Sequence, residues 1–288
     1  MATKLVNTRF CPLVNKLLNF LFWNMRDFTL QKYLLLITKI ISKNYNVLKF
    51  GDFIASDQNA SKILILRHDV DRLPKNALKM AQLEYSIGIK GTYYFRIVPE
   101  SYDQEIMNKI ANLGNEIGYH YEDVDLIQKN WQNSAFSHQK IHHYSKDEMV
   151  DAAYDSFCVH LAQLRENFDI KTICMHGSPL SSYDNRIIWE KYDYKELGII
   201  GEPYLDIDYN QFAYFTDTSR NWSNDKVKSK NNFKLKTTQQ IIDNIDQLPP
   251  NIMFTIHPQR WHDNLVLWSK ELVLQEIKNF IKEHLIIR

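Results

Sequence analysis

The chain has 288 residues, of which 44% are hydrophobic and 24% are charged, the balance of a soluble globular protein rather than a disordered one. Lysine and arginine number 35 against 34 acidic residues, so the formal charge of +1 gives no basic excess of the kind that nucleic-acid binding needs. Three widely spaced cysteines argue against a disulfide framework and a zinc knuckle, and favour a reducing compartment, which we expect to be the cytoplasm.

Neither apolar run near the N-terminus is long enough to cross a membrane. The run over residues 17–23 is interrupted by Asn19, and the run over residues 33–41 by Thr38 and Lys39. A spanning helix needs about 20 consecutive apolar residues, and no secretory signal pattern precedes these runs. We expect an N-terminal apolar extension over residues 1–27 and one domain over residues 28–288, since barrels of this length form single domains.

Strands and helices are predicted to alternate from one end of the chain to the other. Helices are indicated by apolar residues at spacings of three and four, by Pro74 in a first turn, and by a capping box that pairs Ser145 with Glu148. Short runs rich in β-branched and aromatic residues indicate strands. In chain order the predicted elements are a helix over 29–43, strands over 47–50 and 62–67, a helix over 74–88, a strand over 92–97, a helix over 104–113, a strand over 116–120, a helix over 145–168, strands over 171–175, 198–200 and 212–216, a helix over 237–248, a strand over 251–256 and a helix over 265–285.

This alternation predicts the α/β class, with a mostly parallel sheet and helices outside it. Seven or eight strands in this length favour an irregular (β/α)7-8 barrel, and an open doubly wound sheet is the alternative. No Gly-x-Gly-x-x-Gly follows a strand, so dinucleotide binding is not expected. Residues 121–144 have little periodicity and are predicted to form a long connection.

Four predicted strands are each followed at once by polar residues that can bind a metal. These clusters are His68-Asp69-Val70-Asp71, His120-Tyr121-Glu122, His176-Gly177-Ser178-Pro179 and His257-Pro258-Gln259-Arg260-Trp261. Because the C-terminal strand ends of a β/α barrel converge on one mouth, we expect these clusters to share one pocket.

The two aspartates of the first cluster predict a metal site. Asp69 and Asp71 are two residues apart, so in extended backbone they lie on the same face and repel each other unless a cation or a proton separates them. One carboxylate can then bind a divalent metal while the other serves as general base. The alternative is that one of them caps the helix that begins near Pro74.

Histidines at the neighbouring strand ends supply the other ligands. Asp71 with His120 and His176 makes a three-ligand site with room for water, and Asp/His ligation favours zinc. Glu122 is the other candidate for the third ligand, and His176 is alternatively a substrate-binding residue. His257 is expected to be a proton donor, with a ligand role as the alternative.

Six further side chains are candidates for contacting a substrate. Asp217 is also expected to orient an imidazole, and two tryptophans are candidates for the wall of a sugar site, with packed tryptophans beside a polar turn as the alternative. The set is Glu122, Asp217, Arg220, Trp222, Arg260 and Trp261. The remaining histidines in the predicted connection and helices are expected to be solvated or structural; they are His138, His142, His143, His160 and His284.

The ordered set of motifs resembles the polysaccharide deacetylase superfamily, also called NodB-homology or carbohydrate esterase family 4, and within it the divergent branch found with bacterial surface-polysaccharide genes. The resemblance runs from about Phe28 to the C-terminus. It is carried by RHDVD (67–71), EIGYHYE (116–122), CMHGSP (174–179), GEPYLDID (201–208), TDTSRNW (216–222) and IHPQRW (256–261).

The resemblance implies an irregular (β/α)7-type barrel and a metal-dependent hydrolase that removes acetyl groups from sugars by attack of a metal-bound water. It implies Asp69 as the base, Asp71 and His120 as metal ligands and His257 as the catalytic histidine. The substrate it implies is an acetylated sugar of a surface polysaccharide, lipopolysaccharide or capsule precursor.

The chain departs from the family pattern at two places. The family's second motif has two histidines four residues apart, and here Val124 occupies the second position. The usual arginine-proline motif is missing, and CMHGSP stands in its region. A non-catalytic carbohydrate-binding or scaffold protein is therefore the alternative reading, and an amidohydrolase or phosphoesterase is a third.

Overall fold

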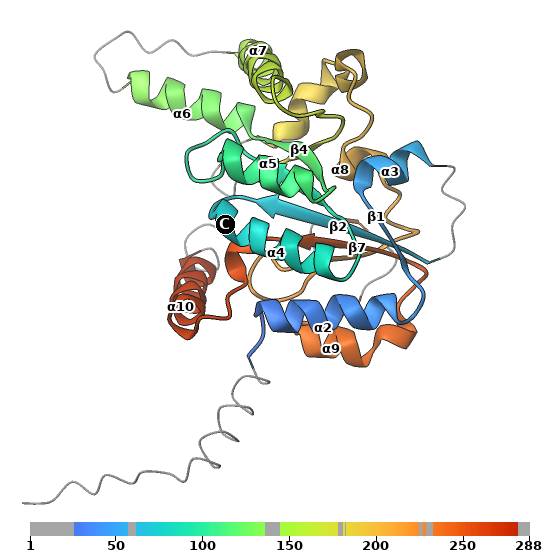
Figure 1. The fold of residues 1–288 in the computed structure, drawn as a ribbon. Helices are drawn as coiled ribbons and strands as arrows, with labels where there is room; N and C mark the ends of the chain where they lie inside the picture. The colour runs from blue at the N-terminus through green and yellow to red at the C-terminus, as the bar shows by residue number, and fades with distance from the viewer. Residues whose placement is uncertain are drawn as a thin grey trace, which may run out of the picture.

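The computed structural model describes residues 26–56, 62–135, 145–177, 181, 183–224, 227–228 and 233–281, with the backbone alone over residues 130–135 (Figure 1). Most of the predicted extension over residues 1–27, three of the histidines in the predicted connection, His284 and the end of the last predicted helix lie outside the described residues. No described helix combines the length and the apolar character that crossing a membrane requires.

Strands and helices alternate as predicted. The strands are β1 (Asn46–Leu48), β2 (Ile63–Val70), β3 (Thr92–Phe95), β4 (Glu116–Tyr121), β5 (Ile173–Met175), β6 (Ala213–Thr216) and β7 (Asn251–Ile256). The helices are α2 (Leu30–Ile41), α3 (Phe50–Ala55), α4 (Pro74–Ser86), α5 (Gln104–Asn112), α6 (Asp123–Ala135), α7 (Lys146–Arg165), α8 (Pro203–Asp206), α9 (Thr238–Asp243) and α10 (Leu265–Ile281), with 3-10 turns η1 (Asn185–Glu190), η2 (Tyr194–Leu197), η3 (Ile245–Gln247) and η4 (Pro258–Arg260).

All seven strands form one parallel sheet in the order β5-β4-β3-β2-β7-β6, with β1 paired to β2 beside this path. β1 pairs with the first half of β2 and β3 with its second half, while β7 runs along the other edge. Among the described residues no pairing joins β5 to β6. The α/β class and the parallel sheet are confirmed, and the described strands form a half-barrel that is compatible with the barrel-like fold that was expected.

Side chains of β2 alternate between the two faces of the sheet, as a period of two requires. Leu64, Leu66 and Val70 pack into the clusters under helices α2, α4, α5 and α7. Ile63 and Ile65 instead join a second cluster on the opposite face, with side chains of α3 and of the neighbouring strands. Arg67 and Asp69 continue this second series, so the chemistry of the first motif lies on the concave face, away from α4 and α5.

One predicted connection and one predicted strand differ from the structure. The chain over residues 121–144 was predicted to be a connection, but its first part forms α6, which packs against α7 and begins with Asp123 and Asp125 in its first turn. The strand predicted over 47–50 ends at Leu48, because Phe50 begins α3 and is buried in the concave cluster. In both segments, packing against residues distant in the sequence determines which secondary structure forms.

Three further boundaries also differ. β2 runs three residues beyond its predicted end, because His68, Asp69 and Val70 pair with β3. The strand predicted over 198–200 is absent, and only an isolated bridge joins Gly201 to Thr172. The helix predicted over 237–248 divides into α9 and η3. The predicted capping box of α7 is confirmed, with Ser145 and Glu148 each bonded to the other's backbone.

Gly118 allows β4 to approach the tyrosine of the neighbouring strand. It pairs with Tyr94 in the parallel register, and a Cβ at this position would overlap the Tyr94 ring and lie 3.0 Å from the Thr172 carbonyl oxygen. The Tyr94 hydroxyl donates to Thr172 Oγ1 at 3.0 Å, which holds the ring in place.

We therefore expect Gly118→Ala to lower the free energy of unfolding by about 1–3 kcal/mol, the usual cost of overfilling a packed site. The measurement is denaturant unfolding followed by circular dichroism. Gly177→Ala is the matched control, because its Cβ would meet nothing closer than 3.9 Å. Equal stability of the two variants would contradict this account of Gly118.

Candidate metal centre

The polar side chains predicted to converge do lie at one edge of the sheet. The strands supply them in spatial order, with His176 after β5, His120 on β4, Asp69 on β2 and Asp71 just after it, and His257 after β7. All are buried or half-buried. Parallel strands present their carboxyl ends at the same edge, and this is why residues from distant parts of the sequence meet here.

Asp71 stands at the centre of this group. Its Oδ2 accepts a hydrogen bond of 2.9 Å from Gln259 Nε2, while its Oδ1 is buried and accepts no hydrogen bond from the described residues. Oδ1 lies 3.5 Å from His120 Nε2 and 3.6 Å from His176 Nε2. One carboxylate oxygen therefore lies close to two imidazole nitrogens.

Hydrogen bonding fixes the tautomer of His120. Its Nδ1 lies 2.8 Å from the carbonyl oxygen of Cys174, and a carbonyl oxygen can only accept. Nδ1 must therefore carry the proton. In the neutral ring Nε2 then presents a lone pair toward Asp71, which is the form that binds a metal.

His176 is oriented by a carboxylate that an arginine holds in place. Its Nδ1 lies 3.3 Å from Glu122 Oε2, an ion-pair distance at an angle outside hydrogen-bond alignment. Arg96 donates to both Glu122 oxygens at 2.8 Å and to the backbone carbonyl of Asp71 at 3.0 Å. A carboxylate on the outer nitrogen of a histidine is the usual second layer of a metal site. Glu122 is thus placed to orient His176, and its oxygens are already bonded to Arg96.

The two distances from Asp71 Oδ1 are compatible with a divalent metal. With metal–ligand distances of about 2.0–2.2 Å, tetrahedral ligand atoms lie about 3.3–3.6 Å apart. The two separations from Asp71 Oδ1 fall at this value. A buried carboxylate oxygen without a donor is costly, and a cation removes that cost.

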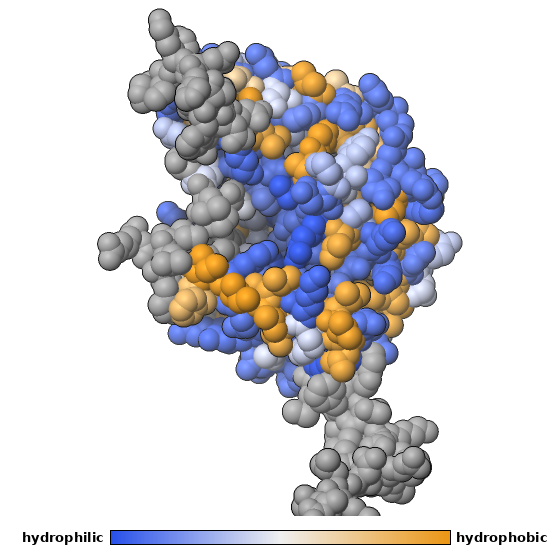
Figure 2. Space-filling model, turned by 90° about the vertical axis from the view of Figure 1, so that its left-hand side faces the viewer, coloured by the Kyte–Doolittle hydropathy of each residue, from blue (hydrophilic) through white to orange (hydrophobic). Residues whose placement is uncertain are grey.

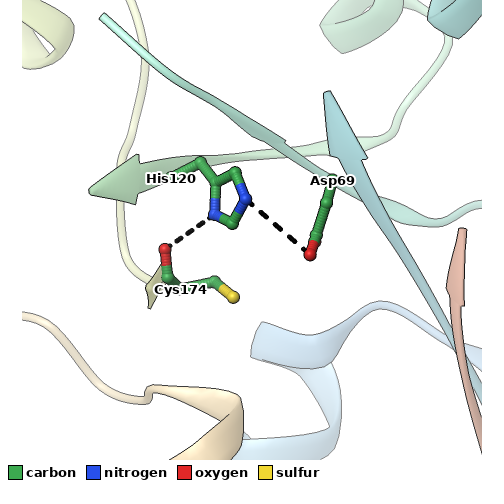
Figure 3. Close-up of side chains that lie close together, drawn as sticks. All are labelled: Asp69, His120 and Cys174. Carbon is green, nitrogen blue, oxygen red and sulfur yellow. Dashed lines mark hydrogen bonds and ion pairs between the residues drawn. The ribbon is translucent and has the colours of Figure 1, made fainter. Parts of the chain in front are cut away.

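A second group of possible ligands shares His120. Asp69, His120 and Cys174 lie close together, and Figure 3 shows His120 between the Cys174 carbonyl and the Asp69 carboxylate, with His120 Nε2 3.7 Å from Asp69 Oδ2. Both Asp69 oxygens are already bonded to Arg67, at 2.8 and 2.6 Å. Burial raises the pKa of the Cys174 thiol well above its ordinary value, and the ligand form is the thiolate. These contacts favour Asp71 over the Asp69 and Cys174 pair.

A third group joins Glu122, Asp125 and His176. Glu122 is bonded to Arg96, and Asp125 accepts from Asn185 Nδ2 at 3.3 Å. The Glu122 and Asp125 carboxylates already accept hydrogen bonds from Arg96 and Asn185. This group is therefore better described as one that orients His176.

The surrounding charges keep both aspartates ionised. Burial alone would raise the pKa of Asp69, but the Arg67 guanidinium and the nearby imidazoles bring it below its ordinary value. Burial would likewise raise the pKa of Asp71, yet the neighbouring imidazoles of His120, His257 and His176 hold it well below that value. Each aspartate is thus an acceptor at neutral pH.

His257 is positioned as predicted by Asp217. Its Nδ1 lies 2.5 Å from Asp217 Oδ1, and Asp217 also accepts from the backbone nitrogen of His257 and from Trp261 Nε1 at 2.6 Å. Because the buried carboxylate can only accept when ionised, Nδ1 carries a proton and Nε2 points to the site, 3.9 Å from Asp71 Oδ2.

Four residues predicted to contact substrate are instead part of the protein interior. Trp222 and Trp261 are 2% and 0% exposed and pack against each other and Phe28, so they form the packed alternative rather than a sugar-binding wall. Arg220 donates to the Arg260 carbonyl, and Arg260 donates to Gln275. His160 is structural as expected, bonded to Asp123.

Val124, which occupies the position of the second histidine in the motif that the sequence resembles, has no atom that can bind a metal. Its side chain is buried in the apolar core at the start of α6, facing away from the site. Arg67, Arg96 and Gln259 were missed as site residues. Only Arg67 carried a sequence signal, because it lies two residues before Asp69 and therefore on the same face of β2.

Comparison with known proteins gives little independent support. No protein-family model and no curated protein matches the chain. Solved structures that overlap with it include a CE4 family pseudoenzyme from Bacillus anthracis, with 13% identity over 78% of this chain and a TM-score of 0.39. Others are the catalytic domain of a peptidoglycan N-acetylglucosamine deacetylase from Eubacterium rectale, with 15% identity over 77% of this chain and a TM-score of 0.36, and a Streptococcus mutans CE4 esterase, with 15% identity over 81% and a TM-score of 0.37.

The chain spans 62% of the Bacillus protein, 86% of the Eubacterium domain and 87% of the Streptococcus enzyme. These neighbours belong to the family that the sequence motifs resemble.

The metal content of two variants distinguishes the two ligand groups that share His120. The first group contains Asp71 and His176, and the second contains Asp69 and Cys174. We expect the zinc-loaded protein to hold one ion per chain after desalting, and Asp71→Asn to lower zinc affinity by at least about tenfold, the scale on which even second-layer changes act. Cys174→Ser should retain the ion, because its thiol is not a ligand. The measurement is inductively coupled plasma mass spectrometry after equilibration at stepped free zinc. Loss of the ion in Cys174→Ser with retention in Asp71→Asn would reverse the assignment.

Proposed function

We propose that this protein is a metal-dependent hydrolase that removes an acetyl group from an acetylated sugar, with precursors of bacterial surface polysaccharides as its substrate class. The observation that carries the hydrolase proposal is the buried Asp71 Oδ1, which faces two imidazole Nε2 atoms and accepts no hydrogen bond from the described residues. The motif resemblance supports the acetylated sugar.

The metal, with zinc favoured by this ligand set, supplies polarisation of an acyl carbonyl and a lowered pKa for water. Asp71, His120 and His176 would hold it. Asp69 remains ionised beside Arg67 and lies within 3.7 Å of a ligand nitrogen, so its carboxylate is placed to accept a proton from water at the site. This chain lacks the usual arginine-proline motif, and the arginine that pairs with Asp69 is Arg67 of β2.

His257 is placed to return a proton to the leaving group. Its Nδ1 proton is held by Asp217, which leaves Nε2 to donate to the departing nitrogen or oxygen when the ring is protonated. Hydrolysis then consumes one water and gives acetate and a free amine or alcohol. Asp69 lies on β2 and His257 at the end of β7. The residue that accepts a proton and the residue that donates one are therefore on different strands.

The direct test is acetate release from acetylated amino-sugar oligomers, with and without a chelator. We expect the zinc-loaded protein to release acetate, and Asp69→Asn and His257→Gln to lower kcat by about 10²–10⁴-fold, the usual contribution of general acid–base groups. Both variants should keep their zinc, since neither residue is an assigned ligand. Asp243→Asn, on the exposed side of α9, is the control and should act as the wild type.

Full activity in Asp69→Asn, or activity that survives complete removal of metal, would contradict the proposal. Bound zinc and bound oligosaccharide without any acetate release would instead indicate the carbohydrate-binding alternative.

Asp217→Asn tests the positioning of His257. The amide cannot accept from Nδ1–H and Trp261 Nε1–H as a carboxylate does, so we expect a loss of kcat of about 10²-fold or more by analogy with other His–Asp pairs, with little change in KM. Asp217→Glu should recover part of the loss. A change confined to KM would show that Asp217 contacts substrate instead.

A further inference from the structure

Gln259 is a buried glutamine that contacts the proposed metal ligand Asp71. It lies in the turn η4, two residues after His257, and is 2% exposed. Its Nε2 donates to Asp71 Oδ2 at 2.9 Å. Because an ionised carboxylate only accepts hydrogen bonds, the nitrogen of the amide must face Asp71. The amide oxygen is buried and accepts no hydrogen bond from the described residues, so this contact is kept although it leaves one acceptor unsatisfied.

The two oxygens of Asp71 face different neighbours. Oδ1 lies 3.5 Å from His120 Nε2 and 3.6 Å from His176 Nε2, and it accepts no hydrogen bond from the described residues. Oδ2 instead accepts the Gln259 hydrogen bond and lies 3.9 Å from His257 Nε2. One oxygen is therefore left for a cation, while the other already has a donor.

Asp69 provides a contrast at the same sheet edge. Arg67 Nε donates to its Oδ1 at 2.8 Å and Arg67 Nη2 to its Oδ2 at 2.6 Å. A guanidinium engages both oxygens of a carboxylate in this way, whereas the single amide nitrogen of Gln259 engages one oxygen of Asp71. Asp69 is thus left with no free oxygen and Asp71 with one.

The turn that carries Gln259 is held by groups outside the candidate metal centre. His262 Nε2 lies 2.9 Å from the Gln259 carbonyl oxygen, and Asn76 Nδ2 of α4 donates to the Pro258 carbonyl at 3.3 Å. A carbonyl oxygen only accepts, so His262 Nε2 carries a proton here. The hydrogen bond from Gln259 to Asp71 is therefore anchored from the protein interior.

Water reaches the other side of this carboxylate. In Figure 1 β2 and β7 point toward the left-hand side of the molecule, and Figure 2 views that side, where hydrophilic residues gather at the centre. The side chains of Asp71 and His176 are 20% and 19% exposed. A ligand position beside Asp71 Oδ1 is thus open to water and to a substrate.

A carboxylate binds a divalent metal through one oxygen or through both. His120, His176 and one oxygen of Asp71 supply three ligand atoms, and a catalytic site with three protein ligands keeps its fourth position open. A second oxygen from Asp71 would compete for that position. We propose that Gln259 is a positioning residue that restricts Asp71 to binding through one oxygen and so reserves a coordination position for water and substrate. This inference rests on the proposed function, because it uses the same metal ligands.

The test is the visible absorption spectrum of the full chain loaded with cobalt(II), which substitutes for zinc and whose bands weaken when a fifth ligand is added. We expect Gln259→Leu to weaken these bands, because the released Oδ2 joins Oδ1 on the metal. The zinc-loaded variant should lose about 10–100-fold in kcat with little change in KM, the scale of changes next to a metal ligand. Its zinc affinity should not fall, because a second carboxylate oxygen compensates for the lost support.

Three further variants make the result specific. Gln259→Ala removes the same donor with less bulk and should show the same weakening, whereas Gln259→Lys keeps a nitrogen donor and should keep the wild-type bands. Gln275→Leu is the matched control, since Gln275 is a buried glutamine, 4% exposed, that bonds to Arg260 and not to a proposed ligand. It should keep both the bands and kcat. Circular dichroism checks that each variant is folded.

Unchanged bands in Gln259→Leu and Gln259→Ala would overturn the inference. A loss of zinc affinity with full kcat at saturating zinc would also overturn it, since Gln259 would then only support Asp71 as a ligand. Weakened bands in a protein that releases no acetate would contradict the hydrolase proposal and leave this inference standing, and acetate release with unchanged bands would do the reverse. Absence of bound cobalt in the wild type would overturn both.

Discussion

A buried carboxylate oxygen that lies beside two imidazole nitrogens and accepts no hydrogen bond from the described residues is the constraint on which this site depends. Asp71 Oδ1 and the Nε2 atoms of His120 and His176 are held in that arrangement from behind, by Gln259, the Cys174 carbonyl and the Glu122–Arg96 pair. Each support holds one of these side chains in its orientation. The protein thus maintains a costly arrangement that a divalent cation would stabilise.

The same sheet edge gives the neighbouring residues their separate roles. Arg67 and Asp69 lie two residues apart on one face of β2, so the guanidinium that keeps Asp69 ionised comes from its own strand. Asp217 at the end of β6 holds His257 at the end of β7. The order of strands in the sheet therefore places a proton acceptor and a proton donor around the proposed metal. His176 is the proposed ligand in place of the histidine that Val124 replaces.

Much of this site could be predicted from the sequence because strand ends in a parallel sheet must share an edge. That rule brought Asp71, His120, His176 and His257 together from separate parts of the chain, and the His257–Asp217 contact followed from the same reasoning. The burial of Trp222 and Trp261 could not be read in this way, because a tryptophan after a strand is compatible with a core or with a pocket. Arg96 and Gln259 were missed because their role depends on side-chain direction. The exposure of apolar side chains of α10, such as Val266 and Val273, was missed because apolar periodicity predicts a helix but does not say which side packs.

The most direct measurement of the central claim is anomalous diffraction at the zinc absorption edge from crystals of the zinc-loaded protein. The account predicts one ion within about 2.0–2.2 Å of Asp71 Oδ1, His120 Nε2 and His176 Nε2, with Arg67 still paired to Asp69. An ion bound to Cys174 Sγ and Asp69, or the absence of any ion among these residues at saturating zinc, would contradict it.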